Sequence, residues 1–202
     1  NLDGERIMVT GGSSGIGLAC VRDLYQKGAE VWAVARDKPK ANKAFSEFYR
    51  TEDPRLQLLV ADLGHWDELL EVCENRDLEP FTSLIFNAGG MPAERQLNPY
   101  GYEMTFASQV LGHATLLFLL HDKGLLAPNC RVIWVSSGGM YLQKLALEDL
   151  NYEKSTYDKV QAYANAKRAQ VILAQELGKR FSGDYTFCAM HPGWVRSPGL
   201  ES

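Results

Sequence analysis

Short apolar runs alternate with longer segments of helical periodicity along almost the whole chain. Each run spans four to six residues and is bounded by glycine or polar residues, as is typical of buried strands. The predicted strands are residues 6–10, 30–35, 56–61, 83–86, 131–135 and 185–190. The predicted helices are residues 16–28, 41–50, 100–121 and 160–180, whereas residues 138–158 are polar and less regular. This alternation predicts an α/β fold in which helices cover both faces of a parallel sheet.

A glycine-rich loop follows the first predicted strand, and its place determines the topology that we expect. Residues 10–17 read TGGSSGIG and lead directly into the first predicted helix. With right-handed crossovers, this position favours a single doubly wound Rossmann-type domain over residues 1–202, with strand order 3-2-1-4-5-6. Ligands then bind at the carboxyl ends of the strands, near the switch between strands one and four.

Composition and charge argue against several other classes of protein. The chain has 202 residues, of which 46% are hydrophobic, and a net charge of -4. Nucleic-acid binders usually carry a basic surplus, so we expect no nucleic-acid partner. The four cysteines stand singly in apolar segments, which predicts buried, reduced thiols and favours an intracellular, cytoplasmic protein. They are Cys20, Cys73, Cys130 and Cys188.

The predicted helix over residues 100–121 contains the longest apolar stretch. Polar residues interrupt it, among them Gln109 and His113, so we expect a buried core helix rather than a membrane span. The same helix could pair two copies of the chain as a homodimer. No signal peptide is visible, but Asn1 lies only a few residues before the first strand, so an upstream targeting segment is compatible with the sequence.

The glycine-rich loop predicts a dinucleotide site. Gly11 permits a tight turn, Gly15 lets the backbone approach a pyrophosphate, and Gly17 lets the helix lie close to the sheet. The helix amino terminus offers N–H groups and a partial positive charge to phosphate, and serine hydroxyls can add donors. The expected contacts in this loop are Gly11, Ser13, Ser14, Gly15, Ile16 and Gly17.

The end of the second strand indicates which dinucleotide binds. Sites that prefer NAD usually carry an acidic residue here, whereas Arg36 can pair with a 2′-phosphate. NADP(H) is therefore favoured over NAD(H), with Asp37 next to Arg36 as the opposing feature. Asp62 and Leu63 end the third strand, where the carboxylate could accept from the adenine amino group or cap a helix that begins near His65.

Polar side chains at the ends of the later strands predict catalysis. Tyr163 and Lys167 are four positions apart in a predicted helix, which places them on one face. An ammonium group beside a phenol lowers its pKa toward a value useful for proton transfer. Ser137 follows the fifth strand and could hold a carbonyl oxygen, and Asn87, Ala88 and Gly89 follow the fourth.

Other chemistries have weaker support in the sequence. His191, Pro192 and Gly193 follow the sixth strand, where they would turn the chain across the nicotinamide, and we expect a structural role for His191. The histidines lack the spacing of metal ligands, so we expect no metal. No G-x-S-x-G elbow is present, which argues against a serine hydrolase of that type.

Taken together, these motifs resemble the short-chain dehydrogenase/reductase family over essentially the whole chain. The matching residues are residues 10–17, Asp62-Leu63, Asn87-Ala88-Gly89, Ser137, Tyr163, Lys167 and Pro192-Gly193. The resemblance implies hydride transfer between a nicotinamide and a small carbonyl or alcohol, with a lipophilic substrate expected. Tyr163 would exchange the proton, Ser137 would orient the oxygen, and Lys167 would bind the nicotinamide ribose. Val195 and Ser197 fall where family members contact the carboxamide.

The chain departs from the family pattern in three places. Gln109 stands where many members have an asparagine that anchors a water on the proton relay. The separation of Ser137 and Tyr163 is about twice the usual one, and the chain stops at Ser202, before the usual substrate lid and seventh strand. A catalytically weak NADP(H)-binding sensor or interaction module is therefore the alternative to an oxidoreductase. A sugar-nucleotide epimerase fits less well, since it would need a larger carboxyl-terminal domain.

Overall fold

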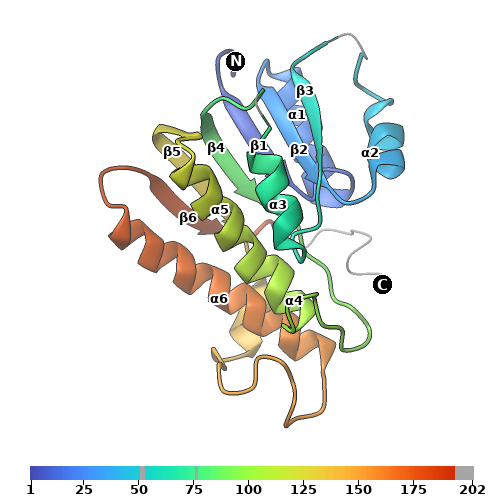
Figure 1. Cartoon of the computed structure of the whole chain (residues 1–202), viewed down its shortest axis with the longest axis vertical. Coiled ribbons are helices and arrows are strands. Elements are labelled where there is room, and N and C mark those ends of the chain that lie inside the picture. The colour runs from blue at the N-terminus through green and yellow to red at the C-terminus, as the bar shows by residue number, and fades with distance from the viewer. Residues whose placement is uncertain (51–52, 76, 194–202) are drawn as a thin grey trace.

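The computed structural model describes residues 1–50, 53–75 and 77–193, which form one six-stranded parallel sheet with helices on both faces (Figure 1). The strands are β1 (Arg6–Thr10), β2 (Glu30–Ala35), β3 (Leu56–Val60), β4 (Phe81–Phe86), β5 (Leu126–Val135) and β6 (Thr186–Met190). The α-helices are α1 (Gly15–Gln26), α2 (Lys38–Phe45), α3 (Trp66–Cys73), α4 (Met104–Phe106), α5 (His113–Asp122) and α6 (Lys159–Arg180). Two further helices are the π-helical η1 (Ala107–Gly112) and the 3-10 helix η2 (Gly138–Leu142).

The strand order is β3-β2-β1-β4-β5-β6 and all pairings are parallel, so the predicted topology is confirmed. Alternate residues of β1 serve different layers, because successive side chains of a strand point to opposite faces. Ile7 and Val9 pack in the cluster formed with α1 and α2. Met8 packs in the larger cluster formed with α3, α5 and α6, the helices drawn in front of the sheet in Figure 1. The side chains on both faces of the central strand β1 are therefore buried from solvent.

The long helix differs from the expected single α-helix over residues 100–121. It begins at Met104, where the Glu103 carboxylate accepts hydrogen bonds from the backbone N–H of Thr105 and Phe106. Its middle, Ala107–Gly112, is π-helical. The 19-residue stretch Met104–Asp122 is long and apolar enough to span a membrane, but 56% of it is buried inside the fold, as in the core helix that we expected.

Some predicted boundaries were wrong. The predicted helix over residues 41–50 is α2, which begins at Lys38, because the Asp37 carboxylate accepts from the N–H of Lys40 and proline is suited to a first turn. The fifth strand begins at Leu126 rather than residue 131. The other strands agree to within two residues at each end.

The expectation of four buried thiols was also wrong. Cys73 and Cys130 are buried, but Cys20 is half-buried and Cys188 is exposed. Cys188 lies on β6, whose side chains are mostly exposed because β6 is the edge strand of the described sheet. The cysteines that are described are all free thiols.

Candidate active site

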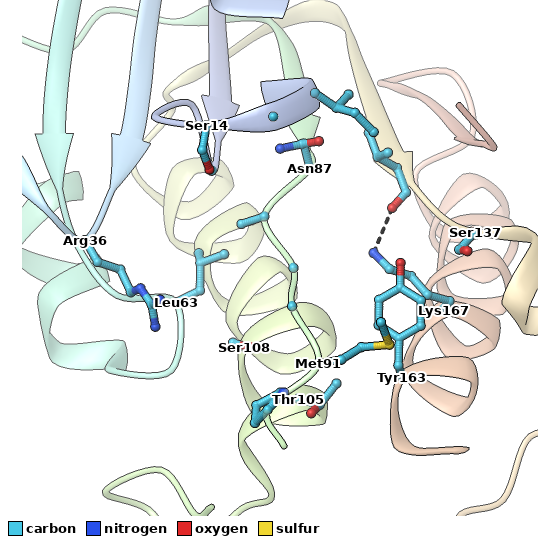
Figure 2. A pocket seen from close by; sticks show the side chains of 18 of the residues that line it. Ser14, Arg36, Leu63, Asn87, Met91, Thr105, Ser108, Ser137, Tyr163 and Lys167 are labelled. Atoms are coloured by element: carbon cyan, nitrogen blue, oxygen red, sulfur yellow. Dashed lines mark hydrogen bonds between the residues drawn. The ribbon is translucent and has the colours of Figure 1, made fainter. Parts of the chain in front are cut away.

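A cleft of about 700 Å³ follows the carboxyl ends of the parallel strands. The loops after β1, β2, β3, β4, β5 and β6 all contribute to its lining, together with α6 and the start of the long helix. Figure 2 shows the arrangement, with Arg36 and Leu63 at one end, Ser14 and Asn87 between, and Tyr163 at the other end. Nearly all the described residues predicted for the site therefore share one cavity.

The glycine-rich loop takes the tight course that was predicted for it. Gly11 has a φ of +69°, and a Cβ there would lie 2.8 Å from the Cα of Ala88. A Cβ on Gly17 would overlap the carbonyl oxygen of Gly11 and lie 2.5 Å from Nδ2 of Asn87. Any larger residue would push the loop off the turn after β4. Gly17 thus packs beneath the cleft, and it is the predicted loop residue that does not line it.

The other loop residues, Gly11, Ser13, Ser14, Gly15 and Ile16, line the cleft. Ser14 is the N-cap of α1, but its hydroxyl makes no capping hydrogen bond. The amino terminus of α1 therefore faces the cleft without a bond from that side chain, which suits it to hold an anion.

At the end of β2 the Arg36 guanidinium lies in the cleft, with a side chain that is 76% exposed. Its Nη1 is 3.4 Å from Oδ2 of Asp62, which makes a long ion pair between the ends of β2 and β3. Asp37 also lines the cleft, but its carboxylate is engaged as the N-cap of α2. Lys40, from the first turn of the same helix, adds a second cation.

Asp62 does not cap a helix, so that half of the prediction was wrong. The N-cap of α3 is His65, and Oδ1 of Asp62 instead accepts from the N–H of Gly64 at 2.8 Å. Asp62 and Leu63 both line the cleft, and the contact of Asp62 with adenine stays a prediction.

The turn after β4 is tied to the end of β1. Nδ2 of Asn87 donates to the carbonyl oxygen of Thr10 at 3.1 Å, as predicted for a bond between neighbouring strands. The Thr10 hydroxyl in return accepts from the N–H of Asn87 at 3.0 Å and of Ala88 at 3.1 Å. These three bonds hold the backbone of residues 87–89 along the floor of the cleft.

Tyr163 and Lys167 lie on one face of α6, as predicted, and Ser137 is beside them (Figure 2). Lys167 is only 2% exposed, and its Nζ donates to the carbonyl oxygen of Val135 at 2.9 Å. Nζ lies 5.4 Å from the centre of the Tyr163 ring. Ser137 caps η2 by accepting from the N–H of Gly139.

The predicted direction of the Tyr163 pKa shift was wrong. Burial raises the pKa of Tyr163, and the Ser137 hydroxyl offsets only part of that rise. Burial also lowers the pKa of Lys167 to about 7, so its charge at neutral pH is partial. The spacing predicted the shared face correctly, but it could not predict desolvation of both groups.

Gln109 lies in the π-helical η1 and is 1% exposed. Its Nε2 donates to the carbonyl oxygen of Gly90 at 2.7 Å, while Oε1 has no hydrogen-bond partner within the described part of the chain. A Cβ on Gly89 would lie 2.9 Å from that Oε1 and 3.4 Å from Nζ of Lys167. The amide is therefore behind the 87–90 segment, close to Lys167.

At the end of β6, His191, Pro192 and Gly193 line the cleft. Nδ1 of His191 accepts from the N–H of Gly193 at 2.8 Å, which fits the structural role expected for this histidine. Val195 and Ser197 lie outside the described residues.

Several residues of the cleft were missed at the sequence level, among them Lys40 and Met91. Lys40 was not predicted because the helix was expected to begin at Ala41, whereas α2 begins at Lys38 and includes Lys40 in its first turn. Met91, labelled in Figure 2, follows Asn87-Ala88-Gly89, where the sequence gives no periodic signal. Within the described residues no group of three or more His, Cys, Asp or Glu side chains is placed to hold a metal.

The chain belongs to the short-chain dehydrogenase/reductase family of oxidoreductases. The family model described as short chain dehydrogenase matches residues 5–145, which covers the glycine-rich loop, the turn after β4 and Ser137. The sheet order and the cleft at the strand ends agree with this assignment.

Individual relatives agree with the family assignment. The chain is 37% identical over 200 residues to dehydrogenase/reductase SDR family member 12 of Bos taurus, covering 98% of this chain and 63% of that protein. It is 34% identical over 201 residues to retinol dehydrogenase 12 of Homo sapiens, covering 97% and 63%. The chain thus spans about three fifths of the length of these relatives.

A solved structure of similar fold is that of an uncharacterised protein from Mycobacterium Paratuberculosis. It matches with a TM-score of 0.86 and 27% identity, covering 96% of this chain and 70% of that one.

Proposed function

We propose that this protein is an NADP(H)-dependent oxidoreductase that interconverts a carbonyl and an alcohol, with Tyr163 as the general acid/base. One observation supports this more than any other: Tyr163, Ser137 and Lys167 meet in the same cleft as the glycine-rich loop. A proton donor, a hydroxyl for the substrate oxygen and a cradle for phosphate are thus within one cavity.

The residues present fit a dinucleotide along the length of the cleft. Gly11 and Gly15 have positive φ values that leave the loop open to a pyrophosphate. When protonated, Nζ of Lys167 has three N–H donors, one of which bonds to Val135, so it can also donate to ribose hydroxyls. Arg36 and Lys40 supply the positive charge that a 2′-phosphate needs, which favours NADP(H) over NAD(H).

When bound, the nicotinamide would supply or accept the hydride. Ser137 would hold the substrate oxygen by donating a hydrogen bond to it, and Tyr163 would give that oxygen its proton during reduction. The raised pKa of Tyr163 keeps the phenol protonated, as this step requires. Lys167, which is held by its hydrogen bond to the carbonyl oxygen of Val135, would position the nicotinamide ribose.

A lipophilic substrate fits the cleft because its lining includes the apolar residues Met91, Pro92 and Ala93 of the segment after β4. A human relative bears the name retinol dehydrogenase 12, which is consistent with a large apolar alcohol or aldehyde. We infer that burial of apolar surface at these residues, rather than a charged contact, binds the substrate.

Replacement of Tyr163 with Phe tests the proposal. We expect turnover in a screen of lipophilic aldehydes and ketones with NADPH to fall by about 100-fold or more. Binding of NADPH, followed by its fluorescence, should stay within about twofold of the wild type because the ring and its packing remain. Equal turnover by both proteins would reject the assigned role of Tyr163.

A catalytically weak NADP(H)-binding sensor or interaction module is the second candidate. The buried Oε1 of Gln109, without a partner among the described residues, favours it, because the relay amide differs from that of many family members. Tight NADPH binding with no turnover of any carbonyl in the same screen would support this candidate. An intracellular location and a homodimer through residues 100–121 stay predictions.

A further inference from the structure

His113 is a buried imidazole for which the proposed mechanism has no use. It begins α5, is 0% exposed and is not among the residues that line the cleft. Its ring stacks on Phe86 at 4.7 Å and lies edge-on to Trp134 at 5.6 Å. Burial lowers the pKa of His113 to about 3, so the ring is neutral at physiological pH. A neutral imidazole in this position has one donor and one acceptor to place.

The two ring nitrogens have partners on different elements. Nδ1 lies 2.8 Å from the carbonyl oxygen of Gln109, which can only accept, so Nδ1 carries the hydrogen. Nε2 must then accept, and the Thr10 hydroxyl lies 2.8 Å from it. The same hydroxyl is 3.5 Å from the carbonyl oxygen of Ile85, so its single hydrogen is better placed on His113.

Donation to His113 leaves the lone pairs of the Thr10 oxygen free. They accept from the backbone N–H of Asn87 and of Ala88, at 3.0 and 3.1 Å. His113 therefore sets the orientation of the Thr10 hydroxyl. Through that hydroxyl it acts on the turn that forms the floor of the cleft.

The opposite end of the same turn is held from η1. Nε2 of Gln109 donates to the carbonyl oxygen of Gly90 at 2.7 Å. The backbone carbonyl of Gln109 accepts both from His113 and, at 2.7 Å, from Nε2 of Gln170 on α6. Residues 87–90 are thus fixed at both ends by the long helix, and His113 belongs to both attachments.

We propose that His113 is a positioning residue that holds residues 87–90 in the place that binds the nicotinamide dinucleotide. It acts through Thr10 on one side and through Gln109 on the other. This inference rests on the proposed function, because it assumes that the turn contacts the cofactor.

The replacement His113→Phe keeps the ring shape and the packing against Phe86 and Trp134 but removes both hydrogen bonds. We expect the Kd for NADPH, measured by fluorescence in the folded protein, to rise about tenfold. The KM for NADPH should rise with it, whereas the KM for the carbonyl substrate should stay within about twofold. A role confined to stability would lower the melting temperature without this split.

Two polar replacements separate the attachments. The amide of Asn reaches the place of Nδ1, so His113→Asn keeps the bond to Gln109 and loses that to Thr10. The longer amide of Gln reaches the place of Nε2, so His113→Gln keeps the bond to Thr10. We expect both variants to bind NADPH less tightly than the wild type. His113→Gln should be the tighter of the two, because the Thr10 hydroxyl that it retains accepts two N–H bonds of the turn. If His113→Phe does not fold, this pair decides, and wild-type Kd values for both would overturn the proposal.

Replacements of Thr10 and His121 complete the design. Thr10→Ser retains the hydroxyl and should bind NADPH as the wild type does. Thr10→Val also deprives the N–H groups of Asn87 and Ala88 of their acceptor, so it should weaken binding at least as much as His113→Phe. The double variant Thr10→Val/His113→Phe should lose less than the sum of the two single losses, because both remove the bond between His113 and Thr10. His121 lies on α5 and bonds to the hydroxyl of Tyr185 at 2.9 Å, outside the cleft, so His121→Gln should leave the Kd unchanged.

The outcomes distinguish this inference from the proposed function. A wild type that binds no NADPH would contradict the proposed function itself. A wild type that binds NADPH, alongside a folded His113→Phe variant with the same Kd, would overturn the role of His113 alone. Additive losses in the double variant would do the same.

Discussion

Lys167 is a buried amine, and its ionisation couples the stability of the protein to pH. Burial lowers the pKa of Lys167 to about 7, from the ordinary value of 10.5 for a lysine side chain. Between these values the unfolded chain binds more protons than the folded one, so the free energy of unfolding rises with pH across this window. Below about pH 7 both states are charged and the folded state bears the full cost of burying the ammonium.

We therefore expect Lys167→Met to stabilise the protein free of cofactor at pH 7 and below. The gain should shrink as pH rises from about 7 to about 10.5, by up to about 5 kcal/mol. Urea unfolding of both proteins across this range measures the difference. Lys179→Met is the matched control, because Lys179 is on the same helix but exposed and paired with Glu176. A gain that is independent of pH, or equal in the control, would contradict the assignment.

We expect Arg36 to determine the preference between the two dinucleotides in the proposed site. Its guanidinium is exposed, and its ion pair with Asp62 is long, at 3.4 Å. The side chain can therefore turn toward a 2′-phosphate. We expect Arg36→Ala to raise the Kd for NADPH by about 10- to 100-fold, because a charge-assisted bond is lost. The Kd for NADH should change by less than about threefold. Lys38→Ala, on the exposed first turn of α2, should change neither value, and parallel losses for both dinucleotides would exclude a 2′-phosphate contact.

At the residue scale, the sequence predicts which groups share a face but not what surrounds them. The spacing of Tyr163 and Lys167 sufficed to place them together on α6. The bond from Lys167 to Val135 joins residues far apart in sequence, so no local pattern could indicate it. His113 was passed over for the same reason, since its partner Thr10 lies 103 positions away in the sequence.

At the scale of elements, the π-helical turn brings the long helix into contact with the strand ends. A Cβ on Gly112 would overlap the carbonyl oxygen of Leu63, which itself lines the cleft. The helix can approach β3 so closely only because this residue has no side chain. The position of Leu63 thus depends on η1.

The replacement Gly112→Ala should therefore lower stability by about 1–3 kcal/mol and weaken NADPH binding, since Leu63 must move. Differential scanning calorimetry and the NADPH Kd measure the two effects. Gly178→Ala on α6 is the control, because among the described residues a Cβ there would meet only Phe187, at an ordinary 3.7 Å. That variant should be neutral or up to about 1 kcal/mol more stable. An equal response of the two variants would argue against a tight contact at Gly112.

The start of β5 and the π-helical turn were missed because no local apolar pattern indicates them. Residues 126–130 of β5 contain Pro128 and Asn129, with Asn129 at a φ of 61°, so their pattern does not suggest a strand. They pair with β4 across a register shift between Phe81 and Ser83 that only the tertiary structure reveals. The π-helical turn is likewise not encoded in any period of apolar residues.

At the scale of the whole molecule, the topology could be predicted because few arrangements satisfy its constraints. A phosphate loop after the first strand, right-handed crossovers and buried strands leave the order 3-2-1-4-5-6 as the favoured one. The same order brings the ends of β1 and β4 together, so the cleft lies where the two halves of the sheet meet. A ligand in that cleft contacts both halves at once.

Dinucleotide binding should consequently stabilise the whole sheet. A ligand that binds only the folded state at about 100 times its Kd adds about 2.7 kcal/mol, which for a chain of this size is roughly 5–10 °C in melting temperature. We expect NADPH to give this shift and NADH, at the same concentration, to give a clearly smaller one, because only NADPH carries the phosphate that Arg36 and Lys40 face. Arg36→Ala should reduce the NADPH shift toward that of NADH. Equal shifts for the two dinucleotides would reject the NADP(H) preference while leaving the dinucleotide site intact, and no shift with either would reject the site.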